Sequence, residues 1–282
     1  MLKKLFTKSF LTRCTSAVFL VIITLVILLA GGMVTFAGIA AISFIGLMEL
    51  LRVYQIHKTL LGLISYLITA GYYGLLWMEQ IKQGIWQEYF PMLVILLIMF
   101  LMAVYVLTFP KFHAEQVMAA FFGVFYVAVM LSYIYQIRML NGGIILVWFV
   151  FLSSWICDTC AYLAGVTMGR RKLAPILSPN KSIEGSVGGV LGSFLFSVLF
   201  GILFEKSLKQ VFENPALSCG IVGALGAVVS QIGDLCASAM KRNKEIKDYG
   251  TLIPGHGGIL DRFDSVIFVA PAIYYLCIYL GR

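Results

Sequence analysis

Long apolar stretches separated by short polar ones run through the whole chain. Each stretch is close to the ~20 residues that a membrane-spanning helix needs. The pattern predicts nine such helices, at about 14–31, 33–51, 59–78, 90–109, 117–136, 143–164, 186–204, 216–235 and 264–281. Because a helix pairs its own backbone polar groups and lipid offers no partners, we expect an all-α polytopic membrane protein.

The composition supports a membrane location. Of the 282 residues, 61% are hydrophobic and 12% are charged, whereas a soluble domain carries about 25% charged residues.

The basic start followed by an apolar stretch resembles a signal peptide. That stretch is too long and no A-x-A cleavage motif follows it, so we interpret it as the first spanning helix. Cys157 and Cys160 form a C-x-x-C pair without a second pair, and we expect them to pack rather than to bind metal.

The distribution of lysine and arginine predicts the orientation, because these residues are retained in the cytoplasm. With a cytoplasmic N-terminus and the C-terminus on the opposite side, 16 of the 21 basic residues fall on cytoplasmic segments. The other 5 are Lys82, Arg138, Lys206, Lys209 and Arg282. This bias and anionic lipid headgroups account for the net charge of +8, so the charge gives no reason to expect nucleic acid as a partner.

Polar residues divide the chain into two regions. Residues 1–140 contain four acidic residues and no motif, so we expect a transmembrane scaffold. Glu49, near the end of the second predicted helix, is interpreted as a side chain that extends to the membrane surface. Residues 141–282 are predicted to be the catalytic transmembrane region, with cytoplasmic loops at 165–185 and 236–263.

All five aspartates of the protein lie in this second region, namely Asp158, Asp234, Asp248, Asp261 and Asp264. In the predicted topology each lies at or beyond the cytoplasmic end of a helix. Asp158 and Asp234 fall just inside predicted spans, where an ionised carboxylate is costly unless it is paired, hydrated or bound to a metal. This placement is the first indication of a functional site.

The spacing of polar residues brings several of them to shared helix faces. If the eighth helix continues past the membrane, Asp234, Ser238 and Lys241 project from one face, with Arg242 beside Lys241. A carboxylate, a hydroxyl and two cations would then line one groove.

Asp261 and Asp264 are three residues apart near the start of the last helix, so they also share a face. Pro254, Gly255, Gly257 and Gly258 precede them and let backbone amides approach an anion at the helix N-terminus. Carboxylates with an incomplete ligand set are typical of Mg²⁺ bound together with phosphates. The alternative for the two aspartates is helix capping with an Asp261–Arg262 surface pair.

The segment SPNKSIEGSVGG (178–189) places Lys181 and Ser182 before a helix that begins near Glu184. It fits either a second phosphate site or an ordinary loop with a helix cap. Small residues then recur at every fourth position along the seventh predicted helix, which indicates close helix packing. They are Gly185, Gly189, Ser193, Ser197 and Gly201.

The segment SAMKRNKEIKDYGTLIPGHGGILDRFDS (238–265) resembles the signature of the phosphatidate cytidylyltransferases, or CDP-diacylglycerol synthases. The matching residues are Ser238, Lys241, Arg242, Lys247, Asp248, Pro254, Gly255, His256, Gly257, Gly258, Asp261, Arg262 and Asp264. DTCAYLAGVTMGRRKL (158–173) and SPNKSIEGSVGG are similar to upstream elements of the family, with Ser182 where threonine is common. The resemblance covers roughly 150–282 by motif and the first half only in hydropathy.

The resemblance implies that phosphatidic acid and CTP react, with Mg²⁺, to CDP-diacylglycerol and diphosphate in phospholipid biosynthesis. It also implies a homodimer in the plasma (inner) membrane, with the active site on the cytoplasmic side. Asp234, Asp261 and Asp264 would bind the metal and, with Lys241 and His256, form the catalytic set. The implied substrate-binding residues are Lys181, Ser182, Ser238, Arg242, Lys247, Asp248, Gly257, Gly258 and Arg262. Whether a second, monovalent cation takes part is left open.

Two other functions also remain open. A CTP-dependent polyprenol kinase would transfer the γ-phosphate to an alcohol and would release CDP. An ion-coupled transporter would also place carboxylates within helices. Against a transporter, the chain shows no obvious repeated halves, and its acidic residues collect on one side rather than at the midplane.

Overall fold

The structure is a computed structural model that describes residues 8–281. Within them, eight helical segments are long and apolar enough to span a membrane, and the first helix adds a shorter apolar part, Val18–Ala30. The first four helices are α1 (Lys8–Ala30), α2 (Gly32–Val53), α3 (Leu60–Ile81) and α4 (Ile85–Leu107). The all-α polytopic architecture is thereby confirmed.

The next two spans are built from several pieces joined by π-helical turns. The fifth span comprises α5 (Ala114–Gly123), η2 (Val124–Val129) and α6 (Met130–Met139). The sixth comprises α7 (Gly143–Leu146), α8 (Trp148–Phe151), η3 (Leu152–Ile156) and α9 (Cys157–Met168). Because π-helical turns often occur at functional sites, it is relevant that η3 ends at Ile156, two residues before Asp158.

The remaining chain contains three spans and two short connecting elements. The spans are α10 (Ile183–Leu203), α12 (Pro215–Asn243) and α13 (Leu260–Leu280), and α11 (Glu205–Leu208) links the first two. Strands β1 (Lys172–Ala174) and β2 (Ser178–Ser182) form an antiparallel hairpin before α10, a small exception to the helical fold. The connecting segments 169–182 and 244–259 are shorter than the predicted loops, because α9 and α12 extend further.

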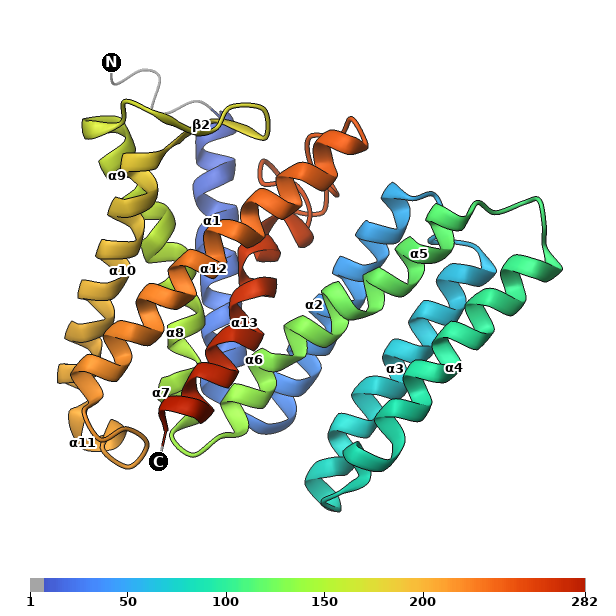
Figure 1. The fold of residues 1–282 in the computed structure, drawn as a ribbon, viewed down its shortest axis with the longest axis horizontal. Coiled ribbons are helices and arrows are strands. Elements are labelled where there is room, and N and C mark those ends of the chain that lie inside the picture. Colours follow the sequence, from blue (N-terminus) through green and yellow to red (C-terminus); the bar gives the residue numbers. More distant parts are fainter. Residues whose placement is uncertain (1–7, 282) are drawn as a thin grey trace.

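Helices of the second region pack as one group. In Figure 1, α9, α10 and α12 lie side by side, and α13 lies between α12 and α6, while α3 and α4 form a pair on the opposite flank. The five small residues along α10 are all buried, which confirms their predicted role in close packing against α9 and α12. A Cβ added at Gly189, for example, would lie 2.9 Å from the carbonyl oxygen of Cys157.

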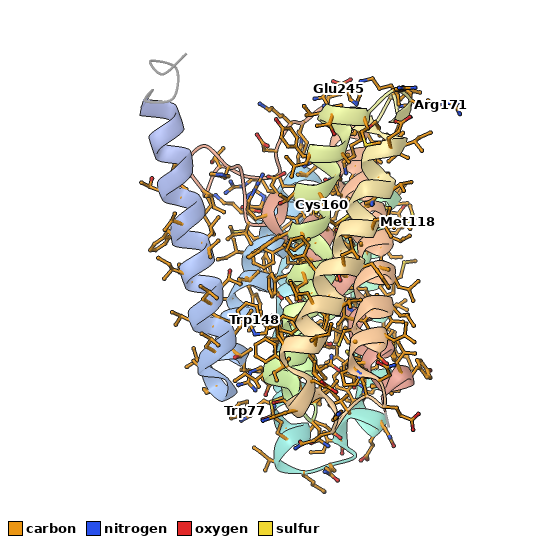
Figure 2. The ribbon with its side chains drawn as sticks, turned by 90° about the vertical axis from the view of Figure 1, so that its left-hand side faces the viewer. Trp77, Met118, Trp148, Cys160, Arg171 and Glu245 are labelled. Atoms are coloured by element: carbon orange, nitrogen blue, oxygen red, sulfur yellow. The ribbon has the colours of Figure 1, made fainter. Side chains whose placement is uncertain are left out.

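The bundle has two ends. The β1–β2 hairpin, the start of α1 and the segment 244–259 lie at one end, which we call the hairpin end (Figure 1). The opposite, far end carries α11 and the α3–α4 turn. Figure 2 shows Arg171 and Glu245 together at the hairpin end and Trp77 at the far end. The structure therefore groups the predicted loops on two faces as the sequence analysis did.

Candidate functional site

A polar cavity of about 380 Å³ lies at the hairpin end, between α1, α9, α12 and α13. We call it the acidic cavity. All four aspartates that occur within helices line it. Its charged and titratable lining residues are Asp158, Asp234, Asp261, Asp264, Lys241, Arg262 and His256. Charged residues that are up to 106 positions apart in the sequence, Asp158 and Asp264, thus meet in one space.

Asp261 is the most extensively bonded of these side chains and is 5% exposed. Its Oδ1 lies 2.9 Å from Nζ of Lys241, and its Oδ2 accepts hydrogen bonds from the amides of Tyr249 and Gly258 at 2.8 and 2.9 Å. The same Nζ lies 4.0 Å from Oδ2 of Asp264. The alternative of an Asp261–Arg262 surface pair is therefore wrong, because Asp261 is buried and pairs with Lys241.

The extension of α12 to Asn243 confirms that Asp234 and Lys241 project from one continuous helix. Asp234 forms an ion pair with Lys181 of β2. Burial lowers the pKa of the Lys181 ammonium, and the nearby carboxylates of Asp158 and Asp264 oppose this shift. The pair links β2 to α12, which carry two separate sequence motifs.

A second cavity of about 530 Å³ lies between α9, the hairpin and α10, and we call it the hairpin cavity. Asp158 lines both cavities, and Lys181 borders the hairpin cavity while it pairs with Asp234 of the acidic cavity. Ser182 also lines the hairpin cavity, and its hydroxyl accepts a hydrogen bond from the amide of Gly185 at 3.1 Å. The predicted cap of α10 is thus present, and a substrate contact by Ser182 stays a prediction.

The glycine-rich turn before α13 is shaped by close approach of carboxylates. Gly257 has φ +82°, and a Cβ at this position would lie 2.8 Å from Oδ2 of Asp261. The amide of Gly258 donates to Asp261, and the amides of Ile259 and Leu260 donate to Glu49 of α2. The amide of Gly258, which belongs to the predicted anion-binding turn, and the two amides that follow it therefore bind carboxylates of the protein itself. Phosphate contacts by Gly257 and Gly258 stay predictions.

Glu49 was misinterpreted from the sequence. Its side chain does not extend to the membrane surface, because the residue is 2% exposed and its carboxylate is packed under the turn before α13. Its partners are 210 and 211 positions away along the chain, so no local pattern indicates the contact. The region expected to be only a scaffold therefore contributes to the site.

Several other predicted residues line neither cavity. Ser238 is half-buried on α12, whereas Arg242, Lys247 and Asp248 are exposed. His256 does line the acidic cavity, and its Nδ1 is buried without a hydrogen-bond partner among the described residues. No sequence motif indicates the lining from α1 and η3, namely Leu20, Val21, Thr24 and Trp155.

The acidic cavity has a donor set that fits Mg²⁺. The position of one ammonium beside both Asp261 and Asp264 shows that the space between these carboxylates admits a cation. Within residues 8–281, no group of three or more acidic, histidine or cysteine side chains is close enough to hold a metal by itself. Mg²⁺ is commonly bound through one or two carboxylates, with water and substrate phosphates completing its shell.

Comparison with known proteins connects this site to an enzyme family. Residues 11–280 match the sequence model of the cytidylyltransferase family. The chain is 34% identical over 271 residues to the phosphatidate cytidylyltransferase of Staphylococcus epidermidis, covering 94% of this chain and 98% of the relative. The proteins of the same name from Staphylococcus saprophyticus and Staphylococcus aureus are 33% and 34% identical over 268 residues, with the same coverage.

These matches include the first half of the chain, in which the sequence analysis found no motif. They confirm the predicted enzyme class, a nucleotidyltransferase in an integral membrane protein. The chain therefore belongs to the cytidylyltransferase family.

Proposed function

We propose that this protein transfers the cytidylyl group of CTP to phosphatidic acid and forms CDP-diacylglycerol and diphosphate. One observation carries the proposal beyond the names of the relatives. Asp234, Asp261, Asp264 and Lys241 line one cavity at the end of membrane-spanning helices. There a phosphate attached to a lipid can meet a nucleotide that stays in water.

The chemistry needs positioning more than it needs a strong base. A phosphomonoester has a second pKa near ~6, so the phosphate of phosphatidic acid is largely dianionic at neutral pH and already nucleophilic. One of its oxygens forms a bond to the α-phosphorus of CTP, and the bond from that phosphorus to the oxygen bridging to the β-phosphorus breaks. The site must neutralise the reacting phosphates and hold them in line.

The residues around the acidic cavity can divide this work. Of the three proposed metal ligands, Asp261 and Asp264 would bind Mg²⁺ directly, and Asp234, which does not form one three-carboxylate group with them in this structure, would act through bound water. The ion supplies charge neutralisation to the triphosphate when bound. Lys241 and Arg262 would contact phosphate oxygens, as both line the cavity. The buried Nδ1 of His256, which has no partner within residues 8–281, can form a hydrogen bond with the departing diphosphate.

The second cavity gives Lys181 a role in the same reaction. Lys181 pairs with Asp234 and borders the hairpin cavity, so its ammonium can contact a phosphate that lies between the two cavities. Leu20 and Val21 of α1 form an apolar wall of the acidic cavity. This wall fits the apolar part of the lipid substrate near its headgroup.

We further propose that the hairpin end faces the cytoplasm and that the protein acts in the plasma (inner) membrane as a homodimer. The support for the orientation is the excess of lysine and arginine on segments of this end. CTP is a cytoplasmic nucleotide, which places its binding site on the same side. The homodimer rests on the family resemblance alone.

Purified protein with phosphatidic acid, Mg²⁺ and CTP labelled in the cytidine and, separately, in the γ-phosphate tests the reaction. The expected products are labelled CDP-diacylglycerol and labelled diphosphate, formed in equal amounts. In a parallel reaction with a polyprenol in place of phosphatidic acid, release of CDP with transfer of the γ-phosphate label to the polyprenol would instead identify the kinase. Omission of Mg²⁺ measures the need for the divalent cation, and addition of K⁺ or Na⁺ in the presence of Mg²⁺ measures the need for a monovalent one.

A further inference from the structure

Glu49 of α2 connects the first half of the chain to the start of α13. Its Oε1 accepts a hydrogen bond from the amide of Ile259 at 3.1 Å, and its Oε2 accepts one from the amide of Leu260 at 2.8 Å. Ile259, at the N-cap position of α13, makes no capping hydrogen bond through its own side chain. Glu49 therefore supplies from another helix the carboxylate that usually comes from the N-cap residue.

Two glycines make room for this carboxylate. A Cβ added at Gly250 or at Gly258 would collide with the Glu49 carboxylate. Gly258 belongs to the signature resemblance, whereas Gly250 does not. The requirement for small residues on both sides of Glu49 shows that the turn closes tightly around it.

The same turn is held at a second point by a predicted metal ligand. The amides of Tyr249 and Gly258 both donate to Oδ2 of Asp261, while Oδ1 of Asp261 faces Lys241. The amides of Gly258, Ile259 and Leu260 are consecutive, and they bind first Asp261 and then Glu49. A shift of the amides that Glu49 holds would therefore shift Asp261 and, three residues later, Asp264.

We propose that Glu49 is a positioning residue: it holds the first turn of α13 so that Asp261 and Asp264 present their free carboxylate oxygens to a divalent cation. Glu49 does not line the acidic cavity, so it acts through the two aspartates and not on substrate. This inference rests on the proposed metal-dependent function of the same site. It gives the scaffold region a specific part in that site.

The test compares two glutamates with the same hydrogen-bonding role. Glu79 accepts hydrogen bonds from the amides of Gly84 and Trp86 at 2.9 and 2.7 Å in the α3–α4 turn at the far end. Glu49→Gln and Glu79→Gln each replace a carboxylate by an amide that can accept only through one oxygen. Both are expected to lower the melting temperature of the detergent-solubilised protein, so stability alone does not distinguish them.

Binding of Mn²⁺, followed by electron paramagnetic resonance without any substrate, does distinguish them. We expect Glu49→Gln to weaken Mn²⁺ binding by about tenfold, in the range found when partners of metal ligands are removed. In the CTP assay, the Mg²⁺ concentration for half-maximal turnover should rise by a similar factor, with KM for CTP at saturating Mg²⁺ little changed. Glu79→Gln should leave both quantities at wild-type values.

Gly250→Ala provides a second variant, because its added Cβ displaces the Glu49 carboxylate without removing it and would also lie 3.1 Å from Cα of Gly258. Gly250→Ala should weaken Mn²⁺ binding as well. The double variant of Gly250→Ala and Glu49→Gln should bind Mn²⁺ no more weakly than the single variant that has the larger loss. Unchanged Mn²⁺ binding in both Glu49→Gln and Gly250→Ala would overturn the proposal. Wild-type protein that binds Mn²⁺ but makes no CDP-diacylglycerol would refute the proposed function and leave the Glu49 test intact.

Discussion

The ammonium of Lys241 lies 2.9 Å from Oδ1 of Asp261 and 4.0 Å from Oδ2 of Asp264, so one cation joins α12 to the first turn of α13. The side chains of Lys241 and Asp261 are 16% and 1% exposed, so water screens this pair less than a surface ion pair. The cation also offsets the repulsion between two carboxylates that share a helix face. The pairing makes Lys241 central both to the folded site and to the proposed reaction.

Replacing Lys241 by alanine should reduce turnover by about 10²-fold, the loss typical when one preorganised charge-stabilising group is removed. The matched control is Lys206→Ala in α11 at the far end, which should keep wild-type turnover. Rates are measured as CDP-diacylglycerol formed, with melting temperatures recorded for both variants. An equal loss of activity in the two variants would indicate general folding damage instead of a site.

Replacing Asp234, Asp261 or Asp264 by alanine should abolish Mg²⁺-dependent turnover, because each removes a proposed ligand and several kcal/mol of transition-state stabilisation. Glu205→Ala is the control, since Glu205 pairs with Lys209 at 2.8 Å on the far end. The measurement is turnover as a function of Mg²⁺ concentration in protein that elutes as a folded species. Wild-type activity in Asp261→Ala would contradict the assignment.

In a profile of turnover against pH, the alkaline loss of turnover should begin below pH 10.5, the usual pKa of a lysine. The reason is that burial lowers the pKa of Lys181, and the neutral amine cannot neutralise phosphate. Lys181→Arg keeps its charge above pH ~12, so its alkaline loss of turnover should move to higher pH.

The free energy of unfolding should change with pH in the opposite direction to turnover. Between the lowered pKa and 10.5 the unfolded chain keeps the proton that the folded chain has lost, so the contribution of Lys181 to the free energy of unfolding rises with pH. Unfolding through this group therefore cannot explain a loss of turnover. An alkaline limb that is identical in wild type and Lys181→Arg would remove Lys181 from the proposed site.

Gly257→Ala should impair turnover, because φ is +82° at this position and the new Cβ would lie 2.8 Å from Oδ2 of Asp261. A left-handed conformation costs a residue with a Cβ roughly 1–2 kcal/mol, and the contact also displaces the carboxylate. Gly74→Ala in α3 is the control, as its Cβ would meet nothing within 4 Å. Turnover and melting temperature are measured for both variants. Full activity in Gly257→Ala would contradict the requirement for glycine at this position.

Single cysteines in an otherwise cysteine-free protein test the orientation. Asn180→Cys, at an exposed position that lines the hairpin cavity, should react with a membrane-impermeant thiol reagent only from the cytoplasmic face. CTP with Mg²⁺ should protect it. Gln210→Cys, exposed between α11 and α12, should react only from the opposite face and without protection. Labelling of both cysteines from the same side would overturn the proposed topology.

The sequence by itself determined the helices and singled out the charged residues that line the acidic cavity. Span lengths follow from a local property, the number of consecutive apolar residues that lipid requires, so the predicted spans agree with the observed helices within a few residues at most ends. The i, i+3 relation of Asp261 and Asp264 is local in the same sense. Helix geometry alone places both carboxylates on one face once α13 begins at Leu260.

Tertiary structure decided which groups meet. Lys181 pairs with Asp234 across 53 positions, and Glu49 binds amides more than 200 positions away. Neither contact leaves a periodic trace in the sequence, because each depends on how separate helices pack. From the sequence, a glutamate near a helix end is interpreted as a surface residue. Only the packing of the helices shows that buried amides lie close enough to donate hydrogen bonds to it. The reason is physical: hydropathy records only how each segment meets the membrane, whereas a buried carboxylate is stable only where folding brings donors to it.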